Sequence, residues 1–122
     1  MKTGQIAVLG AVLCVLCAPF AAAHHSAAAF DFGKSVEIEG IVLRIDVVNP
    51  HLKLILRVTD AKGTREIAYE GHSRANVYRA GWRDGAIKAG DKIKINIAPP
   101  RTGDDGGYVR SFVTASGVKV GS

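Results

Sequence analysis

Sulfur is nearly absent from this sequence, and the little that occurs lies at the N-terminus. Both cysteines, Cys14 and Cys17, and the only methionine, Met1, belong to the first 17 residues. Without that segment the chain has no disulfide, no thiolate and no thioether. This excludes cysteine-dependent catalysis and the soft sulfur sites that bind Cu(I).

Long apolar runs are also absent, apart from Ile6–Cys17. This run follows the basic residue Lys2 and precedes small residues that end at Ala23. The layout is that of a secretory signal peptide with an Ala-x-Ala site, and the run is too short for a membrane-spanning helix. We therefore predict a signal peptide over residues 1–23, cleaved after Ala23. The protein is expected to be periplasmic or secreted, with no transmembrane segment in its mature part.

Acidic residues are outnumbered by basic ones, although only slightly. The 122 residues include 16 Lys and Arg against 11 Asp and Glu, and removal of Lys2 lowers the net charge from +5 to +4. The 99 residues after Ala23 are enough for one small domain with a single core. Without a disulfide this domain depends on packing alone, which favours a compact barrel or sandwich.

Apolar and polar residues alternate with a period of two over most of the later chain, which predicts strands. We expect strands at residues 35–47, 51–59, 64–70, 92–97 and 108–115, and a short helix at 74–80. After Gly40 the apolar side of the first strand moves to Ile41 and Leu43, which indicates a β-bulge at Gly40. Residues 24–34 have no such period and form an N-terminal arm, which Phe30 and Phe32 could attach to the domain.

The order of these elements defines the expected fold. Three strands, a helix and two further strands, with a long bulged first strand, are typical of the oligonucleotide/oligosaccharide-binding (OB) barrel. We predict an all-β protein with one short helix, a five-stranded OB-like Greek-key barrel over residues 35–122. A small open sandwich is the main alternative.

Several short motifs carry a resemblance to a known family. In order, they are Ala23-His24-His25-Ser26, Gly40-Ile41-Val42, Asn49-Pro50-His51, Gly81-Trp82 and Lys88-Ala89-Gly90-Asp91. In this combination the sequence resembles a family of small secreted bacterial proteins, a domain of unknown function (number 6152). The resemblance covers nearly the whole chain after the signal peptide, and it implies export and a small β domain. It implies no activity, because that family is uncharacterised.

All four histidines follow the predicted cleavage site, and together they indicate a metal site. An N-terminal His24 would offer its α-amine and a ring nitrogen to one ion, and His25, His51 or His72 could add imidazoles. Such a nitrogen set suits Cu(II), with Zn(II) or Ni(II) as less favoured metals. Glu70, two residues before His72, could add a carboxylate.

The histidines also have purely structural interpretations. The two N-terminal ones could be solvated residues beside a cleavage site. His51 could satisfy a backbone group after a turn, and His72 could simply mark the end of a strand. Cleavage after Ala21 would instead leave Ala22-Ala23-His24 at the N-terminus, which is again a site selective for Cu(II) or Ni(II).

A second candidate site consists of basic residues that are expected to point outward from three strands and to share one face. These ligand-binding candidates are Lys53, Arg57, Lys92, Lys94 and Arg110. Nucleic acid is not expected there, because only Tyr108 and Phe112 could act as stacking aromatics and an exported protein rarely meets single strands. This surface favours an alternative function, a periplasmic adaptor that binds a protein or an anionic envelope polymer.

No catalytic set of residues is recognisable, since the sequence indicates neither a Ser, His and Asp group nor a pair of catalytic carboxylates. We therefore predict that the protein is not an enzyme but a small exported binding protein. Its first expected ligand is a divalent metal ion, and a periplasmic protein is the alternative partner.

Overall fold

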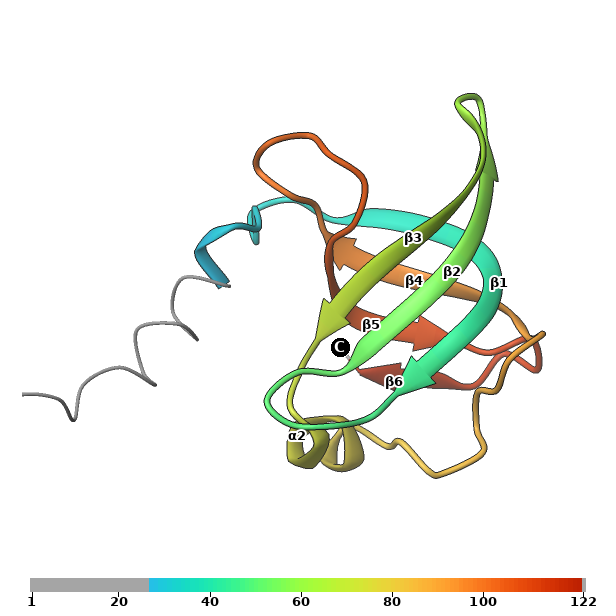
Figure 1. The fold of residues 1–122 in the computed structure, drawn as a ribbon. Coiled ribbons are helices and arrows are strands. Elements are labelled where there is room, and N and C mark those ends of the chain that lie inside the picture. Colours follow the sequence, from blue (N-terminus) through green and yellow to red (C-terminus); the bar gives the residue numbers. More distant parts are fainter. Residues whose placement is uncertain (1–26, 122) are drawn as a thin grey trace, which may run out of the picture.

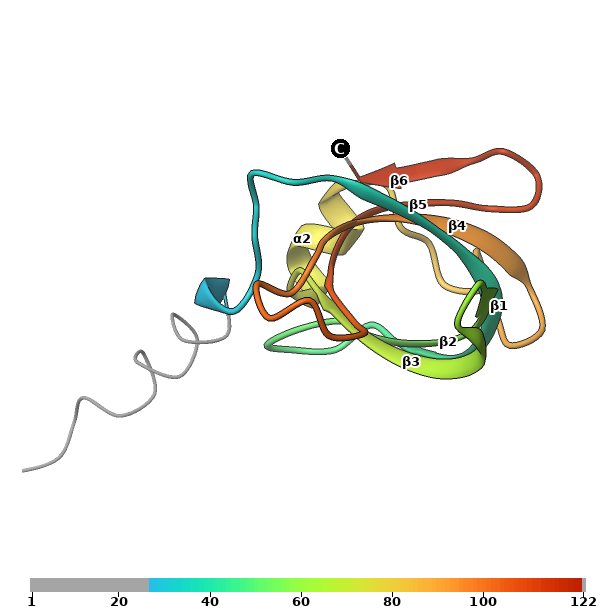
Figure 2. The same cartoon turned by 90° about the horizontal axis from the view of Figure 1, so that it is seen from above.

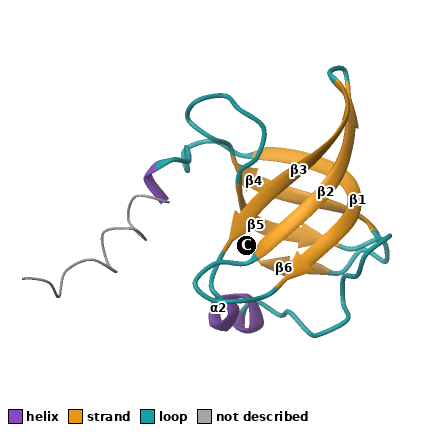
Figure 3. Cartoon of the chain, viewed as in Figure 1, coloured by secondary structure: helices purple, strands orange, loops and turns teal. Residues whose placement is uncertain are grey.

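The computed structural model describes residues 27–121, which form six strands and one short helix. The elements are β1 (Val36–Asp46), β2 (Lys53–Asp60), β3 (Gly63–Gly71), α2 (Arg74–Arg79), β4 (Lys92–Ala98), β5 (Tyr108–Val113) and β6 (Lys119–Gly121), coloured by type in Figure 3. The predicted signal peptide, its cleavage site, His24 and His25 lie outside the described residues. Within residues 27–121, no helix is long and apolar enough to cross a membrane.

Strands β1 to β5 close into a barrel with α2 near one of its ends (Figure 1). Their order is β3-β2-β1-β4-β5, and a short parallel pairing closes the ring, with Glu70 opposite Tyr108 and Gly71 opposite Val109. Figure 2 shows the strands arranged in a ring, with β6 continuing the sheet beyond β5. The predicted all-β class, with a five-stranded barrel and one short helix, is confirmed. Closure excludes the open sandwich, and the strand order is consistent with an OB-like barrel.

The barrel interior is filled by residues that the alternation placed on the inward side of each strand. The buried members of this set are Leu52, Leu54, Leu56, Val58, Ile67, Tyr69, Ile93, Ile95 and Ile97. Burying one such aliphatic side chain contributes about 1.5–3 kcal/mol relative to leaving it exposed. Packing of this kind can hold a small domain together without disulfides.

The irregularity in β1 does not lie at Gly40, where the sequence pattern predicted it. Gly40 pairs regularly with Ile93, and the register against β2 shifts later, between Val42 and Arg44. Gly40 is an inward position, because a Cβ added there would lie 3.2 Å from Leu56 Cβ and 3.3 Å from Val58 Cγ2, which both belong to the buried core. Gly40 therefore interrupts the apolar pattern in the sequence, although the side chains of β1 still alternate between inside and outside at this position. The next buried residue is Val42, whereas Ile41 and Leu43 are half-buried.

Candidate functional site

The turn between β1 and β2 is tied to the first residue of α2. Asn49 Oδ1 accepts a hydrogen bond from the backbone N–H of Arg74 at 3.1 Å. The Arg74 guanidinium in turn donates to the Val47 carbonyl at 3.0 Å. Arg74 thus binds the turn before His51 at two points, through its backbone N–H and through its guanidinium.

Backbone hydrogen bonds just after this turn join the entry of β2 to the end of β3. The Leu52 N–H donates to the carbonyl of His72, and the Gly71 N–H donates to the carbonyl of Leu52, both at 2.9 Å. His51 and His72 therefore lie side by side at this end of the barrel, although they are far apart in the sequence. The structure brings together two of the predicted metal ligands.

The ring of His51 is oriented by a backbone carbonyl. His51 Nδ1 lies 3.0 Å from the Gly71 carbonyl oxygen. Because a carbonyl oxygen can only accept, Nδ1 must carry the hydrogen in this contact, and the neutral ring then has its lone pair on Nε2. The bond satisfies a backbone group, and it is also the kind of bond that orients histidines at metal sites.

Tyr108, at the start of β5, lies against both histidines. Its hydroxyl is 3.1 Å from His72 Nδ1. The tyrosine ring centroid is 5.1 Å from that of His72 and 6.3 Å from that of His51, and both contacts are edge to face. The tyrosine ring thus contacts both imidazoles, and we call this group the His51–Tyr108–His72 cluster.

The charge states of this cluster follow from its surroundings. Burial lowers the pKa of His72 below its ordinary value of 6.5, and the nearby His51 lowers it further. Burial raises the pKa of the Tyr108 hydroxyl, and the charge of Glu70 adds to that rise. At neutral pH the cluster therefore contains a protonated phenol and a His72 ring that is mostly uncharged.

Glu70, the predicted carboxylate ligand, does not complete a metal site with the two histidines. Its backbone lies opposite Tyr108 in the β3–β5 pairing and opposite Lys53 in the β2–β3 pairing. Within residues 27–121, no three or more His, Cys, Asp or Glu residues form a group that could hold a metal ion. Residues 27–121 thus place no third His, Cys, Asp or Glu side chain beside the two histidines.

The N-terminal arm packs against the same tyrosine. The ring centroids of Phe30 and Phe32 lie 5.8 and 5.2 Å from that of Tyr108, which confirms the predicted attachment of the arm. Arg110 donates from Nη2 to the carbonyls of Phe32 and Lys34, the latter at 3.1 Å. The aromatic side chains of the arm and the two histidines therefore share one surface.

A second arginine holds the arm closer to its beginning. Arg101 donates its backbone N–H to the Ala29 carbonyl at 2.9 Å and its Nε–H to the Ala28 carbonyl at 3.1 Å. Phe30 also forms an isolated β-bridge with Pro100. These contacts fix the direction from which the chain approaches the His51–Tyr108–His72 cluster.

Comparison with known protein families shows to which family the chain belongs. The model of a family of unknown function, DUF6152, matches residues 11–110. The chain belongs to this family. The matched segment includes all four histidines and Tyr108. Comparison with curated proteins and with solved structures gives no match.

In this member of the DUF6152 family, the predicted basic face is not a surface of free cations. Lys92 pairs with Glu39 at 2.7 Å and Lys94 pairs with Glu37 at 3.2 Å. Arg57 approaches Glu66 at 3.5 Å across the β2–β3 pair. Because each of these cations has an acidic neighbour on the adjacent strand, the face is close to charge-balanced.

Arg110 lies on the outer surface with Lys94, where both border one shallow pocket, but its guanidinium bonds to the N-terminal arm, as described above. Lys53 stands opposite Asp46 on one side and Glu70 on the other. Tyr108 and Phe112 are only 8% and 4% exposed, so they offer no stacking platform. The reason is that Phe112 belongs to the barrel core and Tyr108 is covered by Phe30 and Phe32 of the arm.

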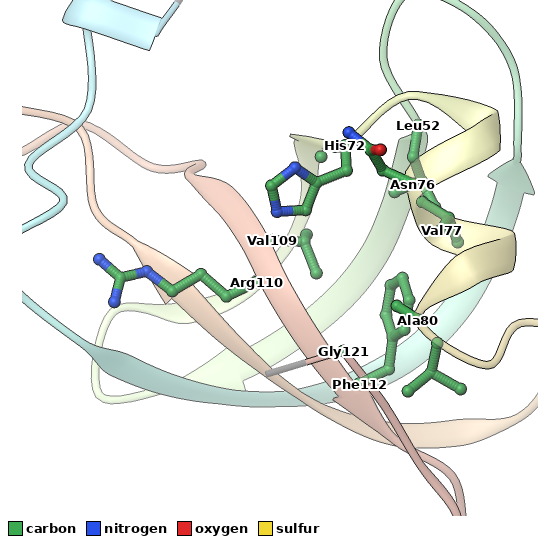
Figure 4. A pocket seen from close by; sticks show the side chains of 11 residues that line it. Leu52, His72, Asn76, Val77, Ala80, Val109, Arg110, Phe112 and Gly121 are labelled. Atoms are coloured by element: carbon green, nitrogen blue, oxygen red, sulfur yellow. The ribbon is translucent and has the colours of Figure 1, made fainter.

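One further feature was not predicted from the sequence, a largely apolar pocket between α2 and β5 that is open to solvent (Figure 4). Its volume is about 360 Å³, and its polar lining includes His72, Asn76 and Arg110. No local pattern in the sequence could have indicated it, because it depends on how the helix is placed against the barrel.

Proposed function

We infer that the processed protein is an exported binding protein for a divalent metal ion, with Cu(II) as the first candidate. His51 and His72 are the proposed ligands within the barrel, and His24 and His25 are the proposed ligands at the N-terminus. The observation that supports this most is the His51–Tyr108–His72 cluster. In it, two imidazoles, one just before β2 and one just after β3, are oriented by uncharged partners, a carbonyl and a phenol.

The length of the arm permits the N-terminal histidines to take part. His25 precedes Phe30 by five residues, which can span at most ~17 Å of extended chain. Phe30 itself contacts Tyr108, the residue that lies between the two barrel histidines. An α-amine and one or two imidazoles could therefore reach an ion held by His51 and His72.

The chemistry of these groups favours Cu(II) over other metals. Imidazole and amine nitrogens suit Cu(II), which stands at the top of the divalent affinity order, while Zn(II) and Ni(II) are the next candidates. Binding needs a deprotonated nitrogen, and the lowered pKa of His72 supplies one at neutral pH without loss of a proton. No sulfur ligand follows Cys17 in the sequence.

Titration of the processed protein with Cu(II) tests this proposal. The protein should begin at His24, a point that mass spectrometry of the exported chain can settle. We expect His51→Gln and His72→Gln each to weaken binding by about tenfold or more, equivalent to roughly 1.4 kcal/mol. An alanine added before His24 should also weaken it, because the amine would no longer belong to that residue.

Matched controls separate the metal function from the alternative. Lys53→Gln and Lys94→Gln change the predicted basic face but no proposed ligand, so they should leave Cu(II) binding unchanged. If the histidine variants and the extended chain bind Cu(II) as tightly as the processed protein, the proposal is wrong.

The alternative function, a periplasmic adaptor that uses the basic strand face, has less support. The ion pairs of Arg57, Lys92 and Lys94 leave little free positive charge on this face for an anionic partner. A salt-sensitive pull-down that is lost in Lys53, Arg57 and Lys94 variants, but kept in histidine variants, would favour it. Absence of enzymatic activity stays a prediction.

A further inference from the structure

The contact between Tyr108 and His72 has the dimensions of two neighbouring ligands on one metal ion. Oη of Tyr108 lies 3.1 Å from Nδ1 of His72. Ions such as Zn(II) and Cu(II) hold nitrogen and oxygen ligands at about 2.0–2.1 Å, which places adjacent ligands about 2.8–3.4 Å apart in square or tetrahedral geometry. An ion can therefore take the place of the shared hydrogen with little movement of either side chain.

The position of Tyr108 is fixed by the fold. The ring centroids of Phe30 and Phe32 lie 5.8 and 5.2 Å from its own, and the residue is only 8% exposed. Its backbone is held in the β3–β5 pairing, opposite Glu70. A ligand whose rotamer is already locked by packing loses little further conformational entropy when a metal binds.

His51 adds a third donor atom beside this pair. Its Nδ1 donates to the Gly71 carbonyl, so that Nε2 has the lone pair available to an ion. Its ring lies edge to face with that of Tyr108, at a centroid distance of 6.3 Å. Within residues 27–121 no third His, Cys, Asp or Glu side chain joins the two histidines. The phenol is the other group of the cluster that can coordinate a metal, as tyrosine does to iron in some haem proteins.

The charge of a divalent ion favours a phenolate at this place. Two neutral imidazoles leave the charge of the ion uncompensated, and an unpaired charge in a partly buried site costs free energy. A phenolate supplies one negative charge. Burial and the nearby Glu70 raise the pKa of the free Tyr108 hydroxyl, but a bound cation acts in the opposite direction because it stabilises the anion directly.

We propose that Tyr108 is a direct ligand of the metal ion, as a phenolate, together with His72 Nδ1 and His51 Nε2. The phenolic proton leaves to solvent as the metal–oxygen bond forms. An ion can reach this position from the open pocket between α2 and β5, which His72 borders (Figure 4). The proposal rests on the metal function proposed above and adds an anionic oxygen to its nitrogen ligands.

Absorption spectroscopy distinguishes a coordinated phenolate from a neighbouring phenol. A Cu(II)–phenolate bond gives an intense charge-transfer band in the visible region, whereas amine and imidazole ligands alone give only a weak d–d band. We expect the intense band to grow as Cu(II) is added to the processed protein and to stop growing at equimolar metal. Tyr108→Phe should abolish the band and weaken Cu(II) binding by about tenfold or more.

Tyr78→Phe is the matched control, because it also removes a hydrogen-bonded hydroxyl. The hydroxyl of Tyr78 bonds to Arg74 and Asp84, neither of which is a proposed ligand. This variant should keep both the band and the affinity for Cu(II). Thermal unfolding of both variants confirms that they are folded.

Failure of this proposal can be told apart from failure of the metal function. If the wild-type protein binds Cu(II) without the intense band, or if Tyr108→Phe keeps the band, Tyr108 is not a ligand, and the metal function is limited to nitrogen ligands. If the wild-type protein binds no Cu(II), the metal function is wrong and the tyrosine ligand is wrong with it.

Discussion

Polar groups are organised in opposite ways on two parts of this barrel. On the outer face of β1 and β4, Lys92 and Lys94 meet Glu39 and Glu37, so that positive charges face negative ones. At the end of the barrel near α2, His51 meets a carbonyl and His72 meets a phenol. The first region pairs charges with charges, and the second pairs titratable rings with neutral groups.

This difference distinguishes an ordinary solvated surface from a candidate binding site. An exposed ion pair satisfies both partners and is worth little to stability, because water and salt screen it. A histidine held by a neutral partner keeps one ring nitrogen for another ligand and is positioned by the fold. The basic residues of the sequence indicated a binding site in the first region, whereas the contacts in the structure favour the second region as the candidate site.

The largest expected effect comes from the packing beneath the histidines. Leu52, which follows His51 directly, is fully buried, and its backbone bonds to Gly71 and His72. Leu52→Ala should lower the free energy of unfolding by about 2–5 kcal/mol, because it removes buried methyl groups and enlarges a cavity. Urea unfolding measures this change. Val118→Ala, at a position that is 56% exposed, is the control and should have little effect. Equal effects would show that the histidine end is not built on packing.

The sequence predicted the inward residues of this region well, because strand alternation is a local property. Leu52 and Leu54 follow directly from the period of two. The His51–Tyr108–His72 cluster could not be predicted from strand alternation. It depends on the parallel β3–β5 closure, which involves only the pairs Glu70 with Tyr108 and Gly71 with Val109.

Two further features have the same origin. Arg110 lies on the outer surface with Lys94, as expected, but its bond to the arm was not predicted. The position of the bulge was wrong because a glycine at an inward position looks, in sequence, the same as a change of phase. Both depend on which strand comes close, and spacing along one strand cannot reveal this.

The link between Tyr108 and His72 should have a moderate effect. Tyr108→Phe removes a hydroxyl that lies 3.1 Å from His72 Nδ1 and should cost about 0.5–1.5 kcal/mol of unfolding free energy. A double-mutant cycle with His72→Gln isolates the contact. A coupling energy of zero would mean that the two side chains are neighbours without an interaction.

Protonation of His72 should have a smaller effect, confined to acid pH. Its folded-state pKa is lowered from 6.5, by burial first and by His51 second, so the unfolded chain binds the proton more readily. Stability should therefore be complete above about pH 6.5 and decline as the pH falls below it. Urea unfolding at several pH values measures this, and His72→Gln should remove this part of the pH dependence. An NMR titration that finds His72 at or above its ordinary pKa would contradict the argument.

The smallest effect is expected on the charged face, where the comparison is most easily broken. Lys92→Gln removes a cation whose Nζ lies 2.7 Å from the exposed carboxylate of Glu39. The hydrogen bond from Lys92 is the main cause that lowers the pKa of Glu39. Because both groups remain hydrated when the pair is lost, the melting temperature should not change measurably, and Cu(II) binding should be unaffected. Differential scanning calorimetry at low and high salt measures the first expectation. A large drop in melting temperature, or a drop that disappears in high salt, would show that this face contributes to the fold as much as the end that holds the histidines.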